Sequence, residues 1–281
     1  MKILVTGGTG TLGSILIDSL LEKSHQVVAL SKNPDKILPR HGLSIVYWEK
    51  ENELPILPPG IQRIYHFGGA VSGAKHNQFF PANVISTKTL WEYAAKKNIE
   101  HMVYASSASV YGFGTGFRET DSLAGKSTYA ISKIEAENFL SKTTVPTTVL
   151  RLASIYGKNS KSFLFKILKY YKKRILLLND SRDTEKTFLH TKDFLRFMNL
   201  LTASPKPGIF NLGEDKPISF WELKKYLVES WKKNYLFLPN FVQTKIASIS
   251  KSNSFVVEKL NAEFGFHCEH SPIHMHPEEW S

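Results

Sequence analysis

The stretch KILVTGGTGTLGSILIDSLLEK at residues 2–23 constrains the fold more than any other part of the chain. An apolar run suited to a buried strand leads into a glycine-rich loop, and a helical pattern follows at once. Gly7, Gly10 and Gly13 suit a tight turn, a close approach of backbone to a pyrophosphate, and close packing of helix on strand. The N–H groups at the start of the helix can then bind an anion. The stretch therefore predicts a dinucleotide-binding loop, whose assigned residues are Thr6, Gly7, Gly10, Thr11, Leu12 and Gly13.

The first half of the chain alternates short apolar runs with helical patterns, which is typical of a parallel sheet covered by helices. Strands are predicted at residues 2–7, 26–31, 43–48, 62–69, 101–107 and 147–157, and helices at 11–23, 83–98 and 127–142. Later helical patterns, at 163–173, 192–203 and 220–233, are interleaved with short strands such as 208–213. These patterns predict an α/β fold: a Rossmann-type doubly wound parallel sheet that binds NAD(P) at residues 1–156, and a smaller C-terminal α/β substrate-binding lobe at residues 157–281, with some chain crossing back to the first domain.

The composition limits where the protein works and what it binds. The chain of 281 residues can bury a substantial core, and it has a single cysteine, Cys268. It has no apolar run of about 18 residues and no signal-peptide pattern, so a cytoplasmic location without a membrane partner is expected. The net charge of +11 suits a phosphorylated small molecule, nucleic acid or an anionic membrane. We interpret the lysine clusters at 169–174 and 224–233 as solvated helix faces, so no nucleic-acid partner is predicted.

The residues after the second predicted strand bear on the choice of cofactor. A site selective for NAD places a carboxylate there, about twenty residues beyond the glycines, to bind the ribose hydroxyls. This chain has Ser31 and Lys32 instead, and a hydroxyl beside a cation suits a 2′-phosphate. The sequence therefore leaves both NADP and NAD open, with NADP slightly favoured. The alternative is that Lys32 is simply exposed to solvent.

The helix predicted at residues 127–142 carries Tyr129 and Lys133 four residues apart, and so on one helical face. An ammonium beside a phenol lowers the phenol pKa below its ordinary value of about 10, which makes a proton donor and acceptor usable near neutrality. Ser107 ends the fifth predicted strand, at the sheet edge where ligands bind. Its hydroxyl could hold the substrate oxygen that Tyr129 protonates, although Ser106 and Ser109 compete for that position.

Short motifs follow one another along nearly the whole chain: TGGTGTLG at 6–13, HFGGA at 66–70, NVISTKTL from Asn83, VYASSASVYG at 103–112, the pair Tyr129 and Lys133, LRLASIYG at 150–157, FLHTKDF at 188–194 and IFNLGEDKPIS from 209. In this order they resemble the extended short-chain dehydrogenase/reductases, which include nucleotide-sugar epimerases, dehydratases and reductases. The resemblance implies NAD(P)-dependent hydride transfer at a secondary alcohol or ketone, of a sugar nucleotide or a related small molecule.

The resemblance also assigns roles to particular residues. It implies that Tyr129 is the catalytic acid and base, that Lys133 is its electrostatic partner and a ribose ligand, and that Ser107 orients the substrate. Tyr129 and Lys133 are both implied to bind the cofactor. Asn83 falls where the family keeps a structural asparagine. A homodimer through the helices that carry Asn83 and Tyr129 is implied as well. His190 and the aspartate three residues later match a signature that braces the two lobes in relatives.

Departures from the family pattern narrow the activity. Family dehydratases carry an acid pair after the orienting hydroxyl, whereas Ala108 and Ser109 follow Ser107 here, so dehydration is not expected. Ser154 stands where sugar-nucleotide members commonly carry an asparagine, which weakens any specific sugar-nucleotide assignment. Three activities stay open: an epimerase that keeps its NAD, an NADPH-dependent ketoreductase acting on a non-sugar carbonyl, and a protein that senses NADP(H) without turnover.

The segment HCEHSPIHMH at residues 267–276 concentrates histidine, cysteine and glutamate near the end of the sequence. Such side chains are zinc or nickel ligands, but their spacing matches no common structural zinc pattern. No metal site is therefore assigned, and the segment is expected to be a solvated tail.

Overall fold

A computed structural model describes residues 1–71, 74–157, 160, 163–171, 175–176, 182–231, 236–237 and 251–276 of the chain. The chain divides into two compact units, each built from separate stretches of sequence. Unit 1 comprises Met1–Val110, Gly125–Arg151 and Phe197–Phe210, and unit 2 comprises Tyr111–Ala124, Leu152–Arg196 and Asn211–Ser281. The assignment of cofactor binding to residues 1–156 and of substrate binding to residues 157–281 stays a prediction.

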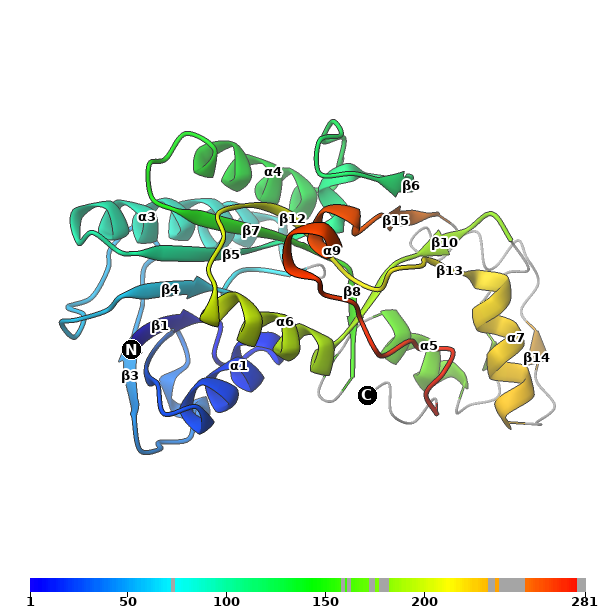
Figure 1. Cartoon of the computed structure of the whole chain (residues 1–281), viewed down its shortest axis with the longest axis horizontal. Helices are drawn as coiled ribbons and strands as arrows, with labels where there is room; N and C mark the ends of the chain where they lie inside the picture. The colour runs from blue at the N-terminus through cyan, green and yellow to red at the C-terminus, as the bar shows by residue number, and fades with distance from the viewer. Residues whose placement is uncertain are drawn as a thin grey trace. The chain divides into compact units, whose positions relative to one another are not determined.

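Unit 1 contains most of a seven-stranded sheet with the strand order β12-β7-β5-β4-β1-β2-β3 (Figure 1). The strands are β1 (Lys2–Thr6), β2 (Gln26–Ser31), β3 (Leu43–Tyr47), β4 (Arg63–His66), β5 (His101–Ser107), β7 (Thr147–Leu152) and β12 (Gly208–Leu212). Strand β1 pairs in parallel with both β2 and β4, so the strand order reverses beside it. Ligands of open α/β sheets bind at such a reversal, outside the carboxyl ends of the strands. The predicted α/β fold with a doubly wound parallel sheet is confirmed.

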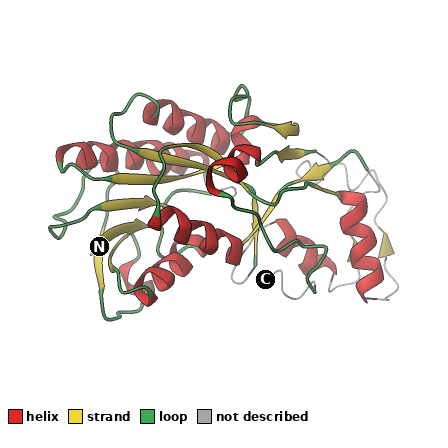
Figure 2. Cartoon of the chain, in the orientation of Figure 1, coloured by secondary structure: helices red, strands yellow, loops and turns green. Residues whose placement is uncertain are grey.

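Apolar side chains explain both the central strands and their cover. Ile3, Leu4 and Val5 are fully buried, as expected of a parallel strand with both faces covered. Helix α1 (Thr11–Glu22) lies on one face of the sheet, and α3 (Ser86–Lys96) and α4 (Thr128–Leu140) lie on the other (Figure 1, Figure 2). Trp91 of α3 and Leu140 of α4 join strand residues in the core beneath these helices.

The helix predicted at residues 83–98 begins irregularly. A short helix, α2 (His76–Phe80), is followed by a π-helical segment, Pro81–Ile85, and only then by α3. Asn83 lies in the π segment and is fully buried. Segments of π-helix often mark functional positions, because they re-aim side chains relative to a regular helix.

The strand predicted at residues 147–157 is wrong as a single element. It forms two strands in different sheets, β7 and β8 (Ser154–Tyr156), and β8 pairs in parallel with β11 (Phe188–His190). The backbone N–H of Ala153 still donates to the Leu212 carbonyl (3.0 Å), whereas the N–H of Ser154 donates to the Thr187 carbonyl (3.1 Å). The chain therefore leaves the large sheet between these two residues.

Unit 2 has its own core, formed by buried residues that include Tyr156, Phe188, Phe220 and Leu227. Its other elements are the sheet β13-β10-β15-β6, with β13 (Ile218–Ser219), β10 (Glu185–Lys186), β15 (Asn253–Phe255) and β6 (Gly114–Phe117); the pair β9 (Ile175–Leu176) and β14 (Leu236–Phe237); and the helices α5 (Phe163–Tyr171), α6 (Thr191–Ala203, which ends in unit 1), α7 (Phe220–Trp231) and α9 (Glu258–Phe264).

The lysine clusters predicted as helix faces lie only partly in the described chain, because residues 172–174 and 232–233 fall outside it. In the parts of the chain that the structure describes, no helix is long and apolar enough to cross a membrane.

Candidate active site

The glycine loop between β1 and α1 is shaped by contacts that leave no room for side chains. Gly7 has φ +75°, and a Cβ on it would lie 2.6 Å from the Phe67 carbonyl oxygen. A Cβ on Gly13 would lie 2.2 Å from the Gly7 carbonyl oxygen, and the Gly10 N–H donates to that same oxygen (2.8 Å). Helix α1 starts after Gly10, which provides no side-chain cap. The first backbone N–H groups of a helix have no partner within it, so this loop fits the phosphates of a dinucleotide.

Ser31 and Lys32 lie at the carboxyl end of β2, as expected, but both side chains have partners within the protein. The Ser31 hydroxyl accepts a hydrogen bond from the Asn33 N–H (3.1 Å). The Lys32 ammonium forms an ion pair with the Glu51 carboxylate (2.5 Å). Glu51 follows β3 and was not predicted as part of the site, because nothing in the local sequence indicates which loop lies beside Lys32.

The Ser107 side chain lies beside the Tyr129 phenol in unit 1, near enough to lower its pKa. Ser107 is the last residue of β5, and Tyr129 stands in the first turn of α4. The position of that turn is fixed by Ser127, whose hydroxyl accepts a hydrogen bond from the Ala130 N–H (3.1 Å). The structure therefore brings together two of the three predicted catalytic side chains.

Of the three serines considered for this position, only Ser107 has a contact with Tyr129 that the structure records. The Ser106 hydroxyl donates instead to the Glu137 carboxylate. The Ser109 hydroxyl is buried without a hydrogen-bond partner, and the Ser109 N–H donates to the Ser107 hydroxyl oxygen (3.2 Å). This arrangement favours Ser107 as the hydroxyl beside Tyr129.

Lys133 lies one helical turn after Tyr129 and is only 5% exposed. Its ammonium donates to the Ala105 carbonyl (2.7 Å) and lies 4.7 Å from the centre of the Tyr104 ring. Burial lowers the pKa of Lys133 to about 7, and the Glu137 carboxylate opposes that fall. Lys133 therefore loses its charge easily near neutral pH.

The expected fall in the pKa of Tyr129 is wrong for this structure. Burial raises the pKa of Tyr129 above its ordinary value, and the nearby Ser107 hydroxyl opposes the rise. The ammonium of Lys133 is directed to the Ala105 carbonyl, so helical spacing alone does not produce the predicted acidification. At neutral pH the Tyr129 phenol therefore keeps its proton.

Glu137 and Arg151 form a buried ion pair that the sequence analysis missed. The Arg151 guanidinium donates through Nη2 (2.7 Å) and Nε (3.1 Å) to Oε2 of Glu137, and the two side chains are 3% and 4% exposed. Glu137 follows Lys133 by four residues on α4, so the helical spacing that pairs Tyr129 with Lys133 also indicates Glu137. This ion pair joins α4 to β7 one helical turn after Lys133.

The side chains of Thr6 and Asn83 form hydrogen bonds within unit 1. The Thr6 hydroxyl is hydrogen-bonded to Nδ1 of His66 (2.7 Å), which joins the ends of β1 and β4. The Asn83 amide donates to the Ala70 carbonyl (3.1 Å) and to the Ser132 hydroxyl (2.9 Å). Asn83 therefore ties the segment after β4 to the helix that carries Tyr129.

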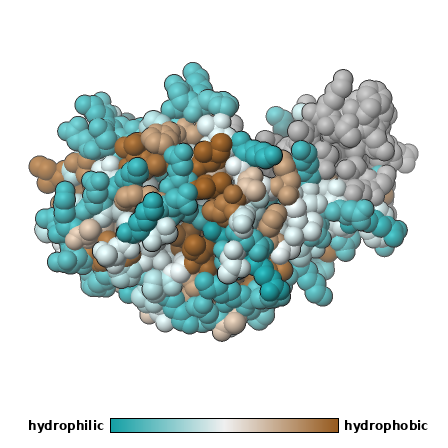
Figure 3. All heavy atoms as spheres, turned by 90° about the horizontal axis from the view of Figure 1, so that it is seen from above, coloured by the Kyte–Doolittle hydropathy of each residue, from teal (hydrophilic) through white to brown (hydrophobic). Residues whose placement is uncertain are grey.

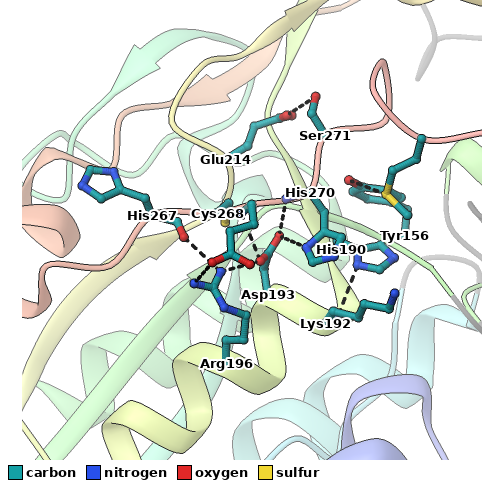
Figure 4. A network of polar contacts seen from close by, with 12 residues as sticks. Tyr156, His190, Lys192, Asp193, Arg196, Glu214, His267, Cys268, His270 and Ser271 are labelled. Atoms are coloured by element: carbon teal, nitrogen blue, oxygen red, sulfur yellow. Dashed lines mark hydrogen bonds and ion pairs between the residues drawn. The ribbon is translucent and has the colours of Figure 1, made fainter.

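Asp193 is the centre of a polar network in unit 2 (Figure 4). It is fully buried, and its carboxylate accepts the backbone N–H groups of Glu269 (3.1 Å) and His270 (3.0 Å) and an ion pair from Arg196 (2.9 Å). The rings of His190 and His270 stack with their centres 4.6 Å apart. The signature residues His190 and Asp193 thus hold the histidine-rich segment.

The expectation of a solvated tail is therefore wrong. Residues 268, 270 and 271 are half-buried, and the Cys268 thiol donates to the Gly213 carbonyl (3.2 Å). Within the described residues, no group of three or more histidine, cysteine or acidic side chains is arranged to hold a metal ion. Packing against α6 explains the order of this segment, since backbone N–H groups that leave water need buried acceptors.

Glu214, in the same network, makes the stability of the fold depend on pH. Burial, together with the nearby carboxylates Asp193 and Asp215, raises the pKa of Glu214 to about 8, although it accepts hydrogen bonds from the Phe188 N–H (3.0 Å) and the Ser271 hydroxyl (3.1 Å). The folded pKa lies above the unfolded value of about 4.3. Below that value Glu214 is protonated in both the folded and the unfolded state, and the free energy of unfolding is at its full value. As pH rises to about 8 only the unfolded state loses the proton, so the free energy of unfolding falls by an amount on the order of a few kcal/mol.

We expect Glu214→Gln to remove this loss, because glutamine stays neutral and keeps an acceptor for the Phe188 N–H. The melting temperature of the variant, measured from pH 5 to 8 by thermal unfolding, should rise relative to the wild type as pH increases. Glu229→Gln, which changes an exposed carboxylate paired with Lys225, is the control and should follow the wild type. Equal pH dependence in Glu214→Gln and the wild type would contradict the raised pKa.

Most of the chain is similar to proteins of one family. The model of the "NAD dependent epimerase/dehydratase family" matches residues 3–213. The "Uncharacterized UDP-glucose epimerase YtcB" of Bacillus subtilis is 27% identical over 236 residues, which cover 73% of each chain. The ADP-L-glycero-D-manno-heptose-6-epimerase of Brachyspira hyodysenteriae is 27% identical over 292 aligned positions, 92% of this chain and 91% of that protein. The solved structure of MoeE5 with UDP-glucuronic acid and NAD shares the fold, with a TM-score of 0.80, 22% identity, and coverage of 99% and 97%.

Proposed function

This chain belongs to the NAD dependent epimerase/dehydratase family, and on that premise we propose that it transfers a hydride between a nicotinamide cofactor and a secondary alcohol or ketone. The observation that carries the proposal is that Ser107, at the carboxyl end of β5, lies beside the Tyr129 phenol, with Lys133 one turn further along α4. A bound nicotinamide supplies the hydride chemistry. The protein's own part is to orient the substrate oxygen and to move its proton.

Tyr129 is the proposed acid and base at the substrate oxygen. In reduction its phenol gives a proton to the oxygen that becomes a hydroxyl, and in oxidation its phenolate takes that proton back. Ser107, whose side chain lies beside Tyr129, would hold the same oxygen. The raised pKa of Tyr129 keeps the phenol protonated at neutral pH, which suits the reductive half of the reaction.

For the substrate we propose a sugar nucleotide that is epimerised, which the names of the two curated relatives and the UDP-glucuronic acid bound to MoeE5 support. Ser154, in place of the asparagine common in sugar-nucleotide members, favours the second candidate, a ketoreductase acting on a non-sugar carbonyl. An epimerase oxidises and re-reduces one carbon, so it needs no added cofactor once NAD is bound. A ketoreductase consumes one reduced cofactor for each product.

One experiment separates these activities. The purified protein is denatured, and any released dinucleotide is identified by chromatography. Undenatured protein is incubated with UDP-sugars or with non-sugar ketones, each with and without NADH or NADPH, while products are followed by NMR. Epimer formation without added cofactor supports the epimerase. Alcohol formation from a ketone only with added NADH or NADPH supports the ketoreductase. Dinucleotide binding without any product would favour a non-catalytic sensor.

We infer that the cofactor is NAD. The NAD dependence that names the family and the NAD bound to MoeE5 support this choice. The preference for NADP depends on Ser31 and Lys32. The Ser31 hydroxyl accepts a hydrogen bond from the Asn33 N–H, and the ammonium of Lys32 is paired with Glu51 rather than left for a 2′-phosphate. The glycine loop suits either dinucleotide, because the two share the pyrophosphate.

We also propose a homodimer through α3 and α4. The face of the molecule that carries these helices exposes apolar side chains among hydrophilic ones (Figure 3), and Ile131 of α4 is 45% exposed. Light scattering on the eluting protein measures its mass, and a monomer would contradict the proposal. The location in the cytoplasm stays a prediction, with which the single cysteine is consistent.

A further inference from the structure

We propose that Glu51 selects NAD over NADP by neutralising Lys32 at the carboxyl end of β2. The inference rests on the proposed use of a nicotinamide dinucleotide. Sites selective for NAD place a carboxylate at the end of the second strand, and this chain has none at the end of β2. A residue after β3 is assigned the discrimination between NAD and NADP instead.

The sheet register places Lys32 beside the glycine loop. Thr6, the last residue of β1, pairs with Leu30 of β2, so the residues that follow each strand meet at one sheet edge. A Cβ on Gly8 would lie 3.9 Å from the Ala29 side chain and 3.2 Å from the Ile37 side chain. The loop that fits the pyrophosphate therefore lies next to the end of β2, where the adenosine ribose of such cofactors is bound.

Backbone contacts bring Glu51 to the same place. Ser31 pairs with Tyr47 in the β2–β3 ladder, and the Trp48 N–H then donates to the Ser31 carbonyl (2.9 Å). The buried indole of Trp48 donates to the Glu53 carbonyl (3.0 Å), which folds residues 48–53 back on themselves. Glu51 is held in this turn with its side chain 19% exposed, while the Lys32 side chain is 49% exposed. The carboxylate is thus the better fixed member of the pair.

The ion pair changes what this edge of the site can bind. A 2′-phosphate carries about two negative charges near neutral pH. To contact Lys32 it would have to lie beside the Glu51 carboxylate or displace it, and like charges at such distances repel. A 2′-hydroxyl is uncharged and can donate a hydrogen bond to a carboxylate. The pair therefore penalises NADP without penalising NAD.

Removal of the Glu51 charge tests the inference by equilibrium binding, without turnover. Dissociation constants for NADH and NADPH are measured by nucleotide fluorescence for the wild type, Glu51→Gln, Glu53→Gln, and the double variant Lys32→Gln with Glu51→Gln. Glu53→Gln is the matched control, because it removes the same charge from an exposed carboxylate of the same turn that pairs with Lys50 (3.8 Å). Thermal unfolding of each variant verifies that it is folded.

We expect the wild type to prefer NADH, and Glu51→Gln to shift the ratio of the two dissociation constants at least tenfold toward NADPH. Glu53→Gln should keep the wild-type ratio. The double variant should lose the gain, because the freed Lys32 is the cation that would bind the phosphate. Raising the salt concentration should reduce the gain in Glu51→Gln, since a charge contact is screened.

Three results would overturn the inference. A wild type that prefers NADPH, or a Glu51→Gln variant whose ratio equals that of Glu53→Gln, would show that Glu51 does not discriminate, while the proposed hydride transfer would stand. A wild type that binds neither nucleotide would remove the proposed function together with the inference.

Discussion

Replacing Tyr129 by phenylalanine should lower kcat by about 10²–10⁴-fold, the range that a positioned acid or base contributes. The change removes one oxygen, that of the hydroxyl that lies beside Ser107. The ring and its packing against Phe79, whose centre lies 6.0 Å away, are kept. Nucleotide affinity should therefore be almost unchanged, because the glycine loop and the end of β2 are untouched. Steady-state turnover of the substrate identified by NMR, with NADH binding measured in parallel, tests both halves of this expectation.

Tyr93→Phe is the matched control, since Tyr93 packs against the core from α3 and has no place in the proposed chemistry. It should retain wild-type kcat. Turnover by Tyr129→Phe within threefold of the wild type would mean that another group moves the proton. Loss of NADH binding along with turnover would instead indicate that Tyr129 supports the cofactor, not the proton transfer.

The parts of the fold that sequence reasoning predicted well depend on local physics. The predicted bounds of β2 and β5 coincide with those observed, because each is a short apolar run bordered by polar residues. The glycine loop was predictable because the positive φ of Gly7 and the crowding at Gly13 exclude side chains at those positions. Helix α4 was predictable from its serine cap and its spacing.

The parts that sequence reasoning missed depend on contacts between distant segments. The division of residues 147–157 into two strands follows from a change of backbone partner at Ala153 and Ser154, which no local pattern encodes. The pairing of Lys32 with Glu51 joins residues nineteen positions apart through a turn held by Trp48. The order of residues 267–276 arises from the buried Asp193, which a count of histidines does not reveal.

The pKa of Tyr129 shows why spacing is not sufficient for electrostatics. Helical spacing correctly predicts that Tyr129 and Lys133 share a face of α4. It does not predict that the ammonium bonds to the Ala105 carbonyl or that burial penalises the phenolate. Desolvation of a titratable group depends on everything packed around it, and that becomes known only with the tertiary structure.

Glu137→Gln should be the most destabilising of the substitutions considered for unit 1. The variant has nearly the same shape but leaves the buried Arg151 guanidinium without the Glu137 carboxylate. Removal of one partner of a buried ion pair typically costs about 3–5 kcal/mol, because the remaining charge stays desolvated. For a domain of this size each kcal/mol lowers the melting temperature by about 2–4 °C. Thermal unfolding should therefore show a fall of roughly 6–20 °C.

The same substitution should also change the pKa of Lys133. The Glu137 carboxylate holds the pKa of Lys133 up against burial, so its removal lowers that pKa further below about 7. A smaller fraction of Lys133 is then charged at neutral pH, and the alkaline limb of the pH profile of kcat, where the charge on Lys133 is lost, should move to lower pH. Glu135→Gln changes an exposed carboxylate two positions before Glu137 on the same helix. It should leave both the melting temperature and the pH profile unchanged. If Glu137→Gln and Glu135→Gln behave alike, the buried pair neither stabilises α4 nor acts on Lys133. If stability falls while the pH profile stays fixed, the pair is structural alone, and the proton affinity of Lys133 is set by burial and the Ala105 carbonyl.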